Sequence, residues 1–395
     1  MARKQEQKDN KPRKKSRERD RLTAKYQLLR LFWLLLIPLG FLWPRLAGGS
    51  AEGVENIYSG KIYPVISRSL AFVSSSIPIS IGLAIVLGLT AVFLLTVVVR
   101  LFRMIFGKLI NKRRNRIRFY SILISFGIFF GVLVNLFYAF WGMNTFRRPL
   151  SDTLCLDIRQ YSAEELASAC RILACRAAEL RENVNEDENG VYDLGNIEDE
   201  LDEVCNAYAL LGEEHKEFSN KVYPAKPGKL SALFSKLNMA GIYVPFTAEM
   251  SINVDQPDLY ILAGAAHETA HYFGFVPEAE AGFIAFMLAD YTDDPALEYS
   301  LIMNALVYCG NALCAKSPAL YGELRATVYT EGMLRDLGSY REYIASYEDD
   351  PAGDIGEKIN DTYLKYSGQS EGVQSYGLMV DYILAYYDAV GLLAS

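Results

Sequence analysis

Charge of either sign is missing from two long stretches of the sequence, residues 69–99 and 119–146. About 20 apolar residues are enough to cross a bilayer, so both stretches are long enough for transmembrane helices. Their presence makes a single homogeneous soluble domain an unsuitable description of the chain. We expect spans at about 77–99 and 119–141, and a third at about 28–46, where the uncharged core is shorter and two prolines interrupt it.

Cysteine is absent from the first 154 residues, and none of the six later cysteines forms a CxxC motif. Six cysteines permit fifteen pairings, and several of these residues fall in sequence typical of helices, where a buried free thiol is ordinary. The sequence therefore predicts no particular disulfide. It also lacks an internal repeat at the periods of solenoid proteins, which excludes that architecture.

The two ends of the chain carry opposite charge. The first 141 residues hold 23 basic and 6 acidic side chains, a net charge of +17, whereas the remainder holds 17 and 41, a net charge of −24. An acidic domain of this kind repels a phosphate backbone, so we expect no nucleic-acid partner.

Basic residues also predict the orientation of the spans. Twelve of them occur in the first 30 residues and eight in the loop 100–118, and basic loops stay in the cytoplasm. We therefore expect a basic cytoplasmic tail at 1–27, a membrane domain at 28–141 and an extracytoplasmic domain at 142–395. The predicted protein is a multi-pass cell-membrane protein in contact with lipid.

The acidic part has the patterns of a mainly helical domain with a little sheet. Ser162 and Glu165 form a capping box that starts a helix. Residues 241–254 are rich in β-forming side chains around a proline, which indicates an edge strand or hairpin. Residues 259–273 predict a helix that ends at Gly274, and Pro277 begins another helix that continues through Asp290.

Two of the three histidines of the chain occur in the sequence His267-Glu268-Thr269-Ala270-His271. A spacing of four places both imidazoles on one face of a helix, where they can bind one Zn²⁺. Glu268 then lies about 100° around the helix, where it can accept a proton from a water molecule. Zn²⁺ is thus the expected cofactor, with His267 and His271 as ligands and Glu268 as the general base.

A catalytic zinc needs a third protein ligand and one open position. Pro277 stands where the metzincin pattern needs a histidine, and His215 lies in an acidic, exposed-looking segment, so neither supplies it. Glu278 and Glu280, both in the first turn of the next predicted helix, remain. The periodicity of the residues that follow does not choose between these two carboxylates.

Several motifs after the last span resemble a bacterial membrane family known as domain of unknown function 3810. The motifs are Gly241-Ile-Tyr-Val-Pro-Phe-Thr-Ala-Glu249, the segment from His267 to His271, Glu280-Ala-Gly-Phe283 and Ser375-Tyr376-Gly377. The order and spacing of these motifs match the family over most of residues 119–393. The family is similar to zincin metallopeptidases that use a glutamate as third zinc ligand.

The resemblance implies roles for particular residues. The Glu-Ala-Asn-Phe motif of the family places the third ligand at Glu280, although Gly282 stands where the family has the asparagine. A zincin-like fold implies that the 241–254 segment binds an extended peptide, with Glu249 contacting a substrate amine or lying on the surface. Tyr376 is the expected donor to the tetrahedral intermediate.

Together these patterns predict a mainly α protein with three transmembrane helices and a zincin-like α+β metallopeptidase domain. Its substrate would be a peptide or protein of unspecified identity, and its oligomeric state is open. One alternative is a non-catalytic, zinc-stabilised binding or sensor domain of the cell envelope, whose metal has a closed fourth position. A second is a membrane scaffold whose histidines bind no metal.

Overall fold

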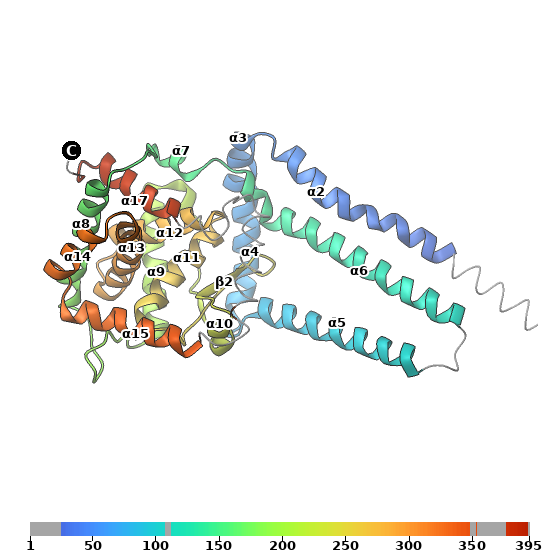
Figure 1. Cartoon of the computed structure of the whole chain (residues 1–395). Helices are drawn as coiled ribbons and strands as arrows, with labels where there is room; N and C mark the ends of the chain where they lie inside the picture. The colour runs from blue at the N-terminus through green and yellow to red at the C-terminus, as the bar shows by residue number, and fades with distance from the viewer. Residues whose placement is uncertain (1–24, 107–111, 348–352, 354–376, 394–395) are drawn as a thin grey trace, which may run out of the picture. The chain divides into compact units, whose positions relative to one another are not determined.

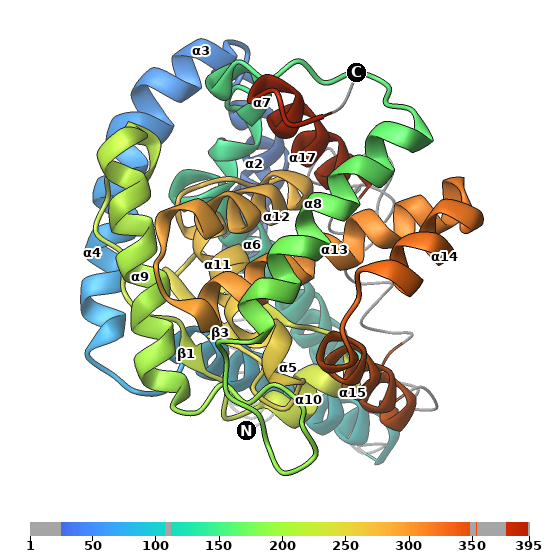
Figure 2. The same cartoon turned by 90° about the vertical axis from the view of Figure 1, so that its left-hand side faces the viewer.

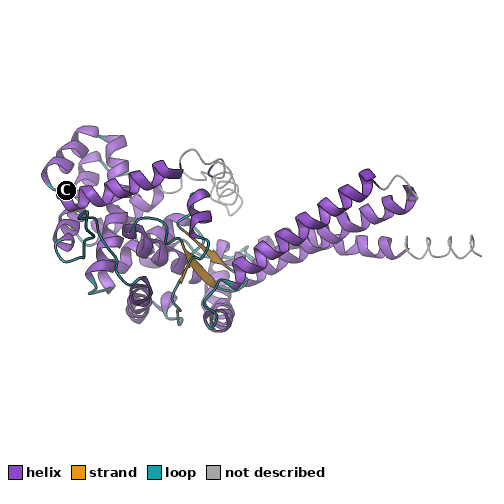
Figure 3. Ribbon diagram, turned by 90° about the horizontal axis from the view of Figure 1, so that it is seen from below, coloured by secondary structure: helices purple, strands orange, loops and turns teal. Residues whose placement is uncertain are grey.

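The computed structural model describes residues 25–106, 112–347, 353 and 377–393, and it is mainly helical, with 74% helix and 4% strand (Figure 3). The described chain forms two compact units. The first unit comprises residues 25–49 and 85–139, and the second comprises residues 50–84 and 140–393. The predicted mainly helical fold is therefore confirmed.

The first unit consists of long apolar helices, labelled in Figure 1. Its elements are η1 (Trp33–Leu35), α2 (Leu36–Ala47), most of α5 (Ile81–Phe106) and nearly all of α6 (Lys112–Phe140). Three helical stretches are long and apolar enough to cross a membrane: Lys25–Ala47, Ile81–Val99 and Phe119–Phe140. The three helices predicted from uncharged sequence are thus present, with boundaries within a few residues of those expected.

Helices and a small sheet build the second unit. Its helices before the β2–β3 hairpin are α3 (Ala51–Gly53), the π-helix η2 (Val54–Ile62), α4 (Tyr63–Ser75), η3 (Gly142–Phe146), α7 (Leu150–Leu154), α8 (Ala163–Arg181), α9 (Ile197–Glu214), η4 (Lys216–Phe218) and α10 (Ser231–Lys236). Its helices after the sheet are η5 (Asp258–Tyr260), α11 (Ile261–Tyr272), α12 (Glu278–Met287), η6 (Leu288–Tyr291), α13 (Pro295–Lys316), α14 (Pro318–Thr327), α15 (Glu331–Tyr347) and α17 (Gly377–Ala389). The capping box of Ser162 and Glu165 is present at the start of α8, as predicted.

The sheet of the described residues has three strands in the order β1-β3-β2. β1 (Lys226–Pro227) is parallel to β3 (Glu249–Ile252), and β2 (Gly241–Val244) is antiparallel to β3. The predicted hairpin is therefore confirmed, with β2 at an edge. The amide of Asn253 donates to the carbonyl of Ala240, so by the alternation of an antiparallel ladder the N–H and C=O groups of Gly241 and Tyr243 point away from β3.

α11 occupies the interior of the second unit, with α12 and α13 beside it (Figure 2). Its first two turns carry small residues, among which Ala265 and Ala266 are fully buried. Small side chains allow helix axes to approach closely, and large rings, among them Tyr272, Phe275 and Phe283, are buried in the same unit. The helix is therefore packed within the core of the second unit.

The segment Ser50–Ala84, which we expected within the membrane domain, belongs to the second unit. Its helices are anchored by a short ion pair between Glu55 and Arg147, by a hydrogen bond from Ser59 to Asn144, and by contacts of Tyr63 described below. Hydropathy did not reveal this segment, because its buried face uses small and polar side chains rather than an apolar stripe.

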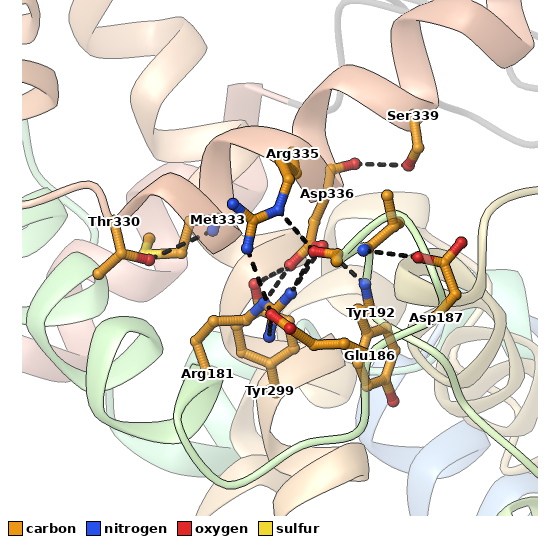
Figure 4. A network of polar contacts seen from close by, with 12 residues as sticks. Arg181, Glu186, Asp187, Tyr192, Tyr299, Thr330, Met333, Arg335, Asp336 and Ser339 are labelled. Carbon is orange, nitrogen blue, oxygen red and sulfur yellow. Dashed lines mark hydrogen bonds and ion pairs between the residues drawn. The ribbon is translucent and has the colours of Figure 1, made fainter.

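A buried polar network ties α8, α13, α15 and the loop after α8 together (Figure 4). Asp336 is fully buried and accepts hydrogen bonds from Arg181 Nε at 2.7 Å, the Tyr299 hydroxyl at 2.6 Å and the Tyr192 amide at 2.8 Å. The carboxylate therefore neutralises the Arg181 guanidinium, whose side chain is 5% exposed. Buried charges persist in folded proteins when they are paired in this way.

Candidate metal centre

α11 positions both histidines of the sequence motif. His267 and His271 lie one turn apart, with ring centroids 4.8 Å apart and ring planes at 87°. The helix ends directly after them, because Gly274 adopts a φ of +86°, a conformation that suits glycine. The chain then turns into α12, which returns beside α11 and brings a carboxylate to the histidines.

That carboxylate belongs to Glu278. Its Oε2 lies 2.9 Å from His267 Nε2, and its Oε1 lies 3.6 Å from His271 Nε2. One ligand atom from each of these three residues lies within 4.8 Å of the others. The structure therefore brings two imidazole nitrogens and one carboxylate oxygen to a common point.

Glu280 does not join this group, in contrast to the expectation from the family motif. Residues two apart on a helix point about 200° apart, so Glu278 and Glu280 cannot face the same neighbour. The Glu280 carboxylate instead accepts the Leu150 amide at 2.9 Å and the Tyr382 hydroxyl at 3.3 Å. It thus links α12 to α7 and α17.

Gly282 occupies the position of the asparagine in the family motif. A Cβ atom added there would lie 2.7 Å from Sδ of Met379, closer than real contacts allow. The missing side chain therefore permits the close packing of Met379 of α17 on α12, and an asparagine there would require the Met379 side chain to shift.

A backbone carbonyl on the side of the ring away from Glu278 fixes the orientation of His271. Its Nδ1 lies 2.7 Å from the carbonyl oxygen of Phe275. A carbonyl only accepts hydrogen bonds, so Nδ1 carries a proton, and Nε2 is the ring nitrogen that faces Glu278. The indole N–H of Trp141 also donates to the His271 carbonyl at 2.9 Å. Such a second layer is typical of metal-binding histidines.

Glu268 lies against the edge strand β2. A Cβ atom added to Gly241 would lie 2.9 Å from Glu268 Cγ and 3.1 Å from Oε1, so only glycine leaves this space to the carboxylate. Glu268 is buried, and the backbone amide of Tyr243 lies within hydrogen-bonding reach of its carboxylate. The side chain is therefore held between the histidine helix and the outward-facing backbone of β2.

The charges of the site support one another. Burial raises the pKa of the Glu268 carboxyl, and the neighbouring imidazoles only partly offset this effect. Burial also disfavours charge on His271, but the Glu278 carboxylate outweighs it and raises the pKa of His271 to about 9. Conversely, His271 and then His267 hold the pKa of Glu278 well below its usual range despite burial. The site thus favours a positive charge beside Glu278.

Two predicted residues remain, Tyr376 and Glu249. Tyr376 lies outside the described residues, so its role stays a prediction. Glu249 is buried rather than on the surface, and its carboxylate accepts the amides of Ile81 and Gly82 and binds Lys226. These contacts leave it with a role in the fold at the start of α5 rather than at a substrate amine.

Tyr308, on α13, is a neighbour of the site that the sequence did not reveal. Burial, Tyr340 and the charge of Glu278 together raise the pKa of the Tyr308 hydroxyl to about 12. The hydroxyl therefore lies within electrostatic reach of Glu278. No short motif marks this residue, because its position depends on the packing of α13 against α11 and α12.

The donor set fits a zinc ion. Two neutral imidazole nitrogens and one carboxylate oxygen are the protein ligands of the glutamate class of zinc sites. The carbonyl behind His271 supplies the support that such a ligand needs. Among the residues that the structure describes, the group comprises three donors, the number of protein ligands in a catalytic zinc site.

The fold and the site define a mainly helical protein with three apolar helices of membrane-spanning length and a His–His–Glu cluster in a separate compact unit. The chain belongs to the family described as "Protein of unknown function (DUF3810)", whose model matches residues 58–384. No curated protein and no solved structure matches the chain significantly.

Proposed function

We propose that this protein is a membrane-anchored zinc metallopeptidase in which His267, His271 and Glu278 hold the ion. The observation that carries the proposal is the convergence of three ligand atoms within 4.8 Å. They lie beside the buried Glu268, which belongs to the same helix as the two histidines. A histidine pair on an ordinary surface helix would not be expected to meet a buried carboxylate and to have one ring locked by a carbonyl.

Each residue of the site has a task in peptide hydrolysis. A bound zinc ion supplies Lewis-acid chemistry, because it lowers the pKa of water toward about 7 and polarises a carbonyl. The Glu268 carboxylate takes the proton released by the attacking water and returns it to the leaving amine. Phe275 holds His271 in one tautomer, and Tyr308 or Tyr376 would donate a hydrogen bond to the developing oxyanion.

The edge strand β2 favours a peptide as the substrate. Gly241 and Tyr243 direct their backbone groups away from β3, and Glu268 lies beside Gly241 with its carboxylate within reach of the Tyr243 amide, so a peptide strand would pair with the other outward groups. An extended peptide that pairs with this edge forms main-chain hydrogen bonds, as in other proteins that bind peptides by strand addition. Its backbone then passes Glu268, which places a scissile bond within reach of the general base.

A structural zinc site is the rival proposal, and the donor count argues against it. Structural sites are closed by four protein ligands. In the described residues the cluster offers three, while Glu268 lies on the neighbouring face of the helix. An arrangement with a general base and one open position suits catalysis better than stabilisation.

We also propose that the second unit lies outside the cytoplasm. Residues 50–84 and 140–393 belong to one unit, and the chain leaves it through α5 and returns through α6. These helices would therefore cross the membrane as a hairpin, and by the positive-inside rule the eight basic residues of the 100–118 loop favour a cytoplasmic tip. A membrane-impermeant thiol reagent should label exposed Cys155, Cys175 and Cys314 in intact cells. Labelling only after lysis would contradict this orientation.

The activity is tested with the purified full-length protein and a proteome-derived peptide library analysed by mass spectrometry. The wild-type protein should generate new peptide termini, and Glu268→Gln should generate none while binding one zinc ion per chain. His215→Ala, which changes the third histidine of the chain, is the matched control and should cleave normally. Equal cleavage by the wild-type protein and Glu268→Gln, or no cleavage by either protein, would contradict the proposal.

A further inference from the structure

The segment between the first two apolar helices is itself a long helix. α3, η2 and α4 follow one another without a break from Ala51 to Ser75. At about 1.5 Å per residue this segment is about 37 Å long. α4 is labelled in Figure 1.

The two faces of α4 are the reverse of those of an ordinary surface helix. The face packed against the second unit is made of Tyr63, Ser67, Ala71 and Ser74, all buried. The opposite face exposes large apolar side chains, with exposed fractions of 66% for Val65, 65% for Phe72 and 63% for Val73, and it continues into η2 at Ile62, which is 46% exposed. Surface helices of soluble proteins direct their apolar stripe to the core, so this outward face indicates a non-aqueous neighbour.

Chain connectivity identifies that neighbour. α2 ends at Ala47 and α5 begins at Ile81, so the two links to the segment consist of residues 48–50 and 76–80. At no more than about 3.5 Å per residue, these links reach roughly 10 Å and 18 Å. If α2 and α5 cross the bilayer, both ends of the segment are held near the same membrane face. A helix tied in this way at both ends lies along the surface.

Positive charge accompanies the apolar face. Arg68, Phe72, Lys221 and Tyr223 line a cavity of about 390 Å³, and the Lys221 ammonium lies 5.0 Å from the Tyr223 ring. Basic groups beside aromatic and aliphatic side chains are the composition of helices that rest on anionic lipid headgroups. Arg68 can extend its charged end to the phosphates while its stem stays on the apolar face.

We propose that η2 and α4 form an interfacial helix that rests on the lipid surface through Ile62, Val65, Phe72 and Val73, with Arg68 and Lys221 at the headgroup phosphates. The proposal does not depend on peptidase activity. The buried face of α4 contacts residues next to the candidate metal centre. The Tyr63 hydroxyl donates to the Tyr272 carbonyl at 2.7 Å and lies 3.1 Å from the Tyr243 hydroxyl. The helix thereby connects the lipid surface to the end of α11.

Site-directed spin labelling of the full-length protein in lipid vesicles tests the proposal. Single labels are placed at Val65→Cys and Phe72→Cys in a background whose exposed cysteines, Cys155, Cys175 and Cys314, are serine. The matched control is a label on native Cys314, on α13, in a chain in which only Cys155 and Cys175 are replaced by serine. Relaxation by oxygen, which enters lipid, is compared with relaxation by a nickel chelate, which stays in water.

We expect oxygen to relax the labels at residues 65 and 72 more strongly than nickel, with depths of about 5–10 Å. The label at Cys314 should show the reverse. Stronger relaxation by nickel at residues 65 and 72 would place this face in water and overturn the proposal. Weak relaxation by both reagents would show that protein covers the face, and it would also overturn it.

Discussion

Replacing Asp336 with asparagine should destabilise the second unit more than any change on its surface. The substitution keeps the size of the side chain but removes the buried counter-charge of Arg181, which leaves only the partly exposed Glu186 carboxylate, 2.9 Å away, to pair with the guanidinium. It also places an NH₂ group, which can only donate hydrogen bonds, among hydrogen-bond donors, since Arg181, Tyr299 and the Tyr192 amide all donate to this carboxylate. Breaking one partner of a buried ion pair costs about 3–5 kcal/mol.

For a unit of this size, each kcal/mol lowers the melting temperature by about 2–4 °C, so a loss of roughly 6–20 °C is expected. Differential scanning fluorimetry of the detergent-solubilised protein measures it. Asp388→Asn is the matched control, because Asp388 pairs with Arg159 at the surface, where its side chain is 42% exposed. A combined Arg181→Met and Asp336→Leu variant removes both charges and should recover part of the loss. A melting temperature for Asp336→Asn equal to that of the control would refute this reasoning.

Three further predictions concern the site and its surroundings. Gly241→Ala should lower peptide cleavage about 10–100-fold at unchanged zinc content, because the new Cβ would displace Glu268, whose Cγ lies 2.9 Å away; unchanged cleavage would contradict this packing. Burial and the charge of Asp294 raise the pKa of Glu200 to about 7, so folding loses stability as the pH rises from about 4.5 to about 7. Glu200→Gln should lack that loss. If the melting temperatures of the wild-type protein and of Glu200→Gln changed by the same amount across this pH range, the predicted contribution of Glu200 would be contradicted. Tyr308→Phe should reduce cleavage but not zinc binding if this tyrosine is the donor to the oxyanion, and full activity would leave that role to another residue.

Much of this architecture follows from local sequence patterns. Uncharged runs located the three apolar helices, the capping box of Ser162 located the start of α8, and β-forming residues around Pro245 located the hairpin. In each case the signal lies within one element. The histidine pair is of the same kind, because its geometry depends only on the pitch of one helix.

The choice between Glu278 and Glu280 lies beyond such patterns. Both are in the first turn of α12, and the face that meets α11 depends on how α12 packs between α11 and α17. The family motif favoured Glu280, whose carboxylate is instead used by Leu150 and Tyr382. Contacts between segments more than 100 residues apart in sequence decided this outcome, and no local periodicity encodes them.

The packing of Ser50–Ala84 into the second unit could not be predicted from the sequence, for a related reason. Short loops between membrane spans are usually read by charge and hydropathy, and this one has modest values of both. Its attachment to the second unit depends on single polar contacts, such as that of Arg147 with Glu55. Contacts of this kind become visible only when the whole fold is known.

Zinc analysis of matched carboxylate variants tests the central claim most directly. The full-length protein, Glu278→Gln and Glu280→Gln are purified in parallel, and bound zinc is measured by inductively coupled plasma mass spectrometry after dialysis against a weak chelator. The wild-type protein and Glu280→Gln should each retain about one zinc ion per chain, as expected for a single three-ligand site, whereas Glu278→Gln should lose it. Retention by Glu278→Gln together with loss by Glu280→Gln, or no zinc in the wild-type protein, would contradict the account.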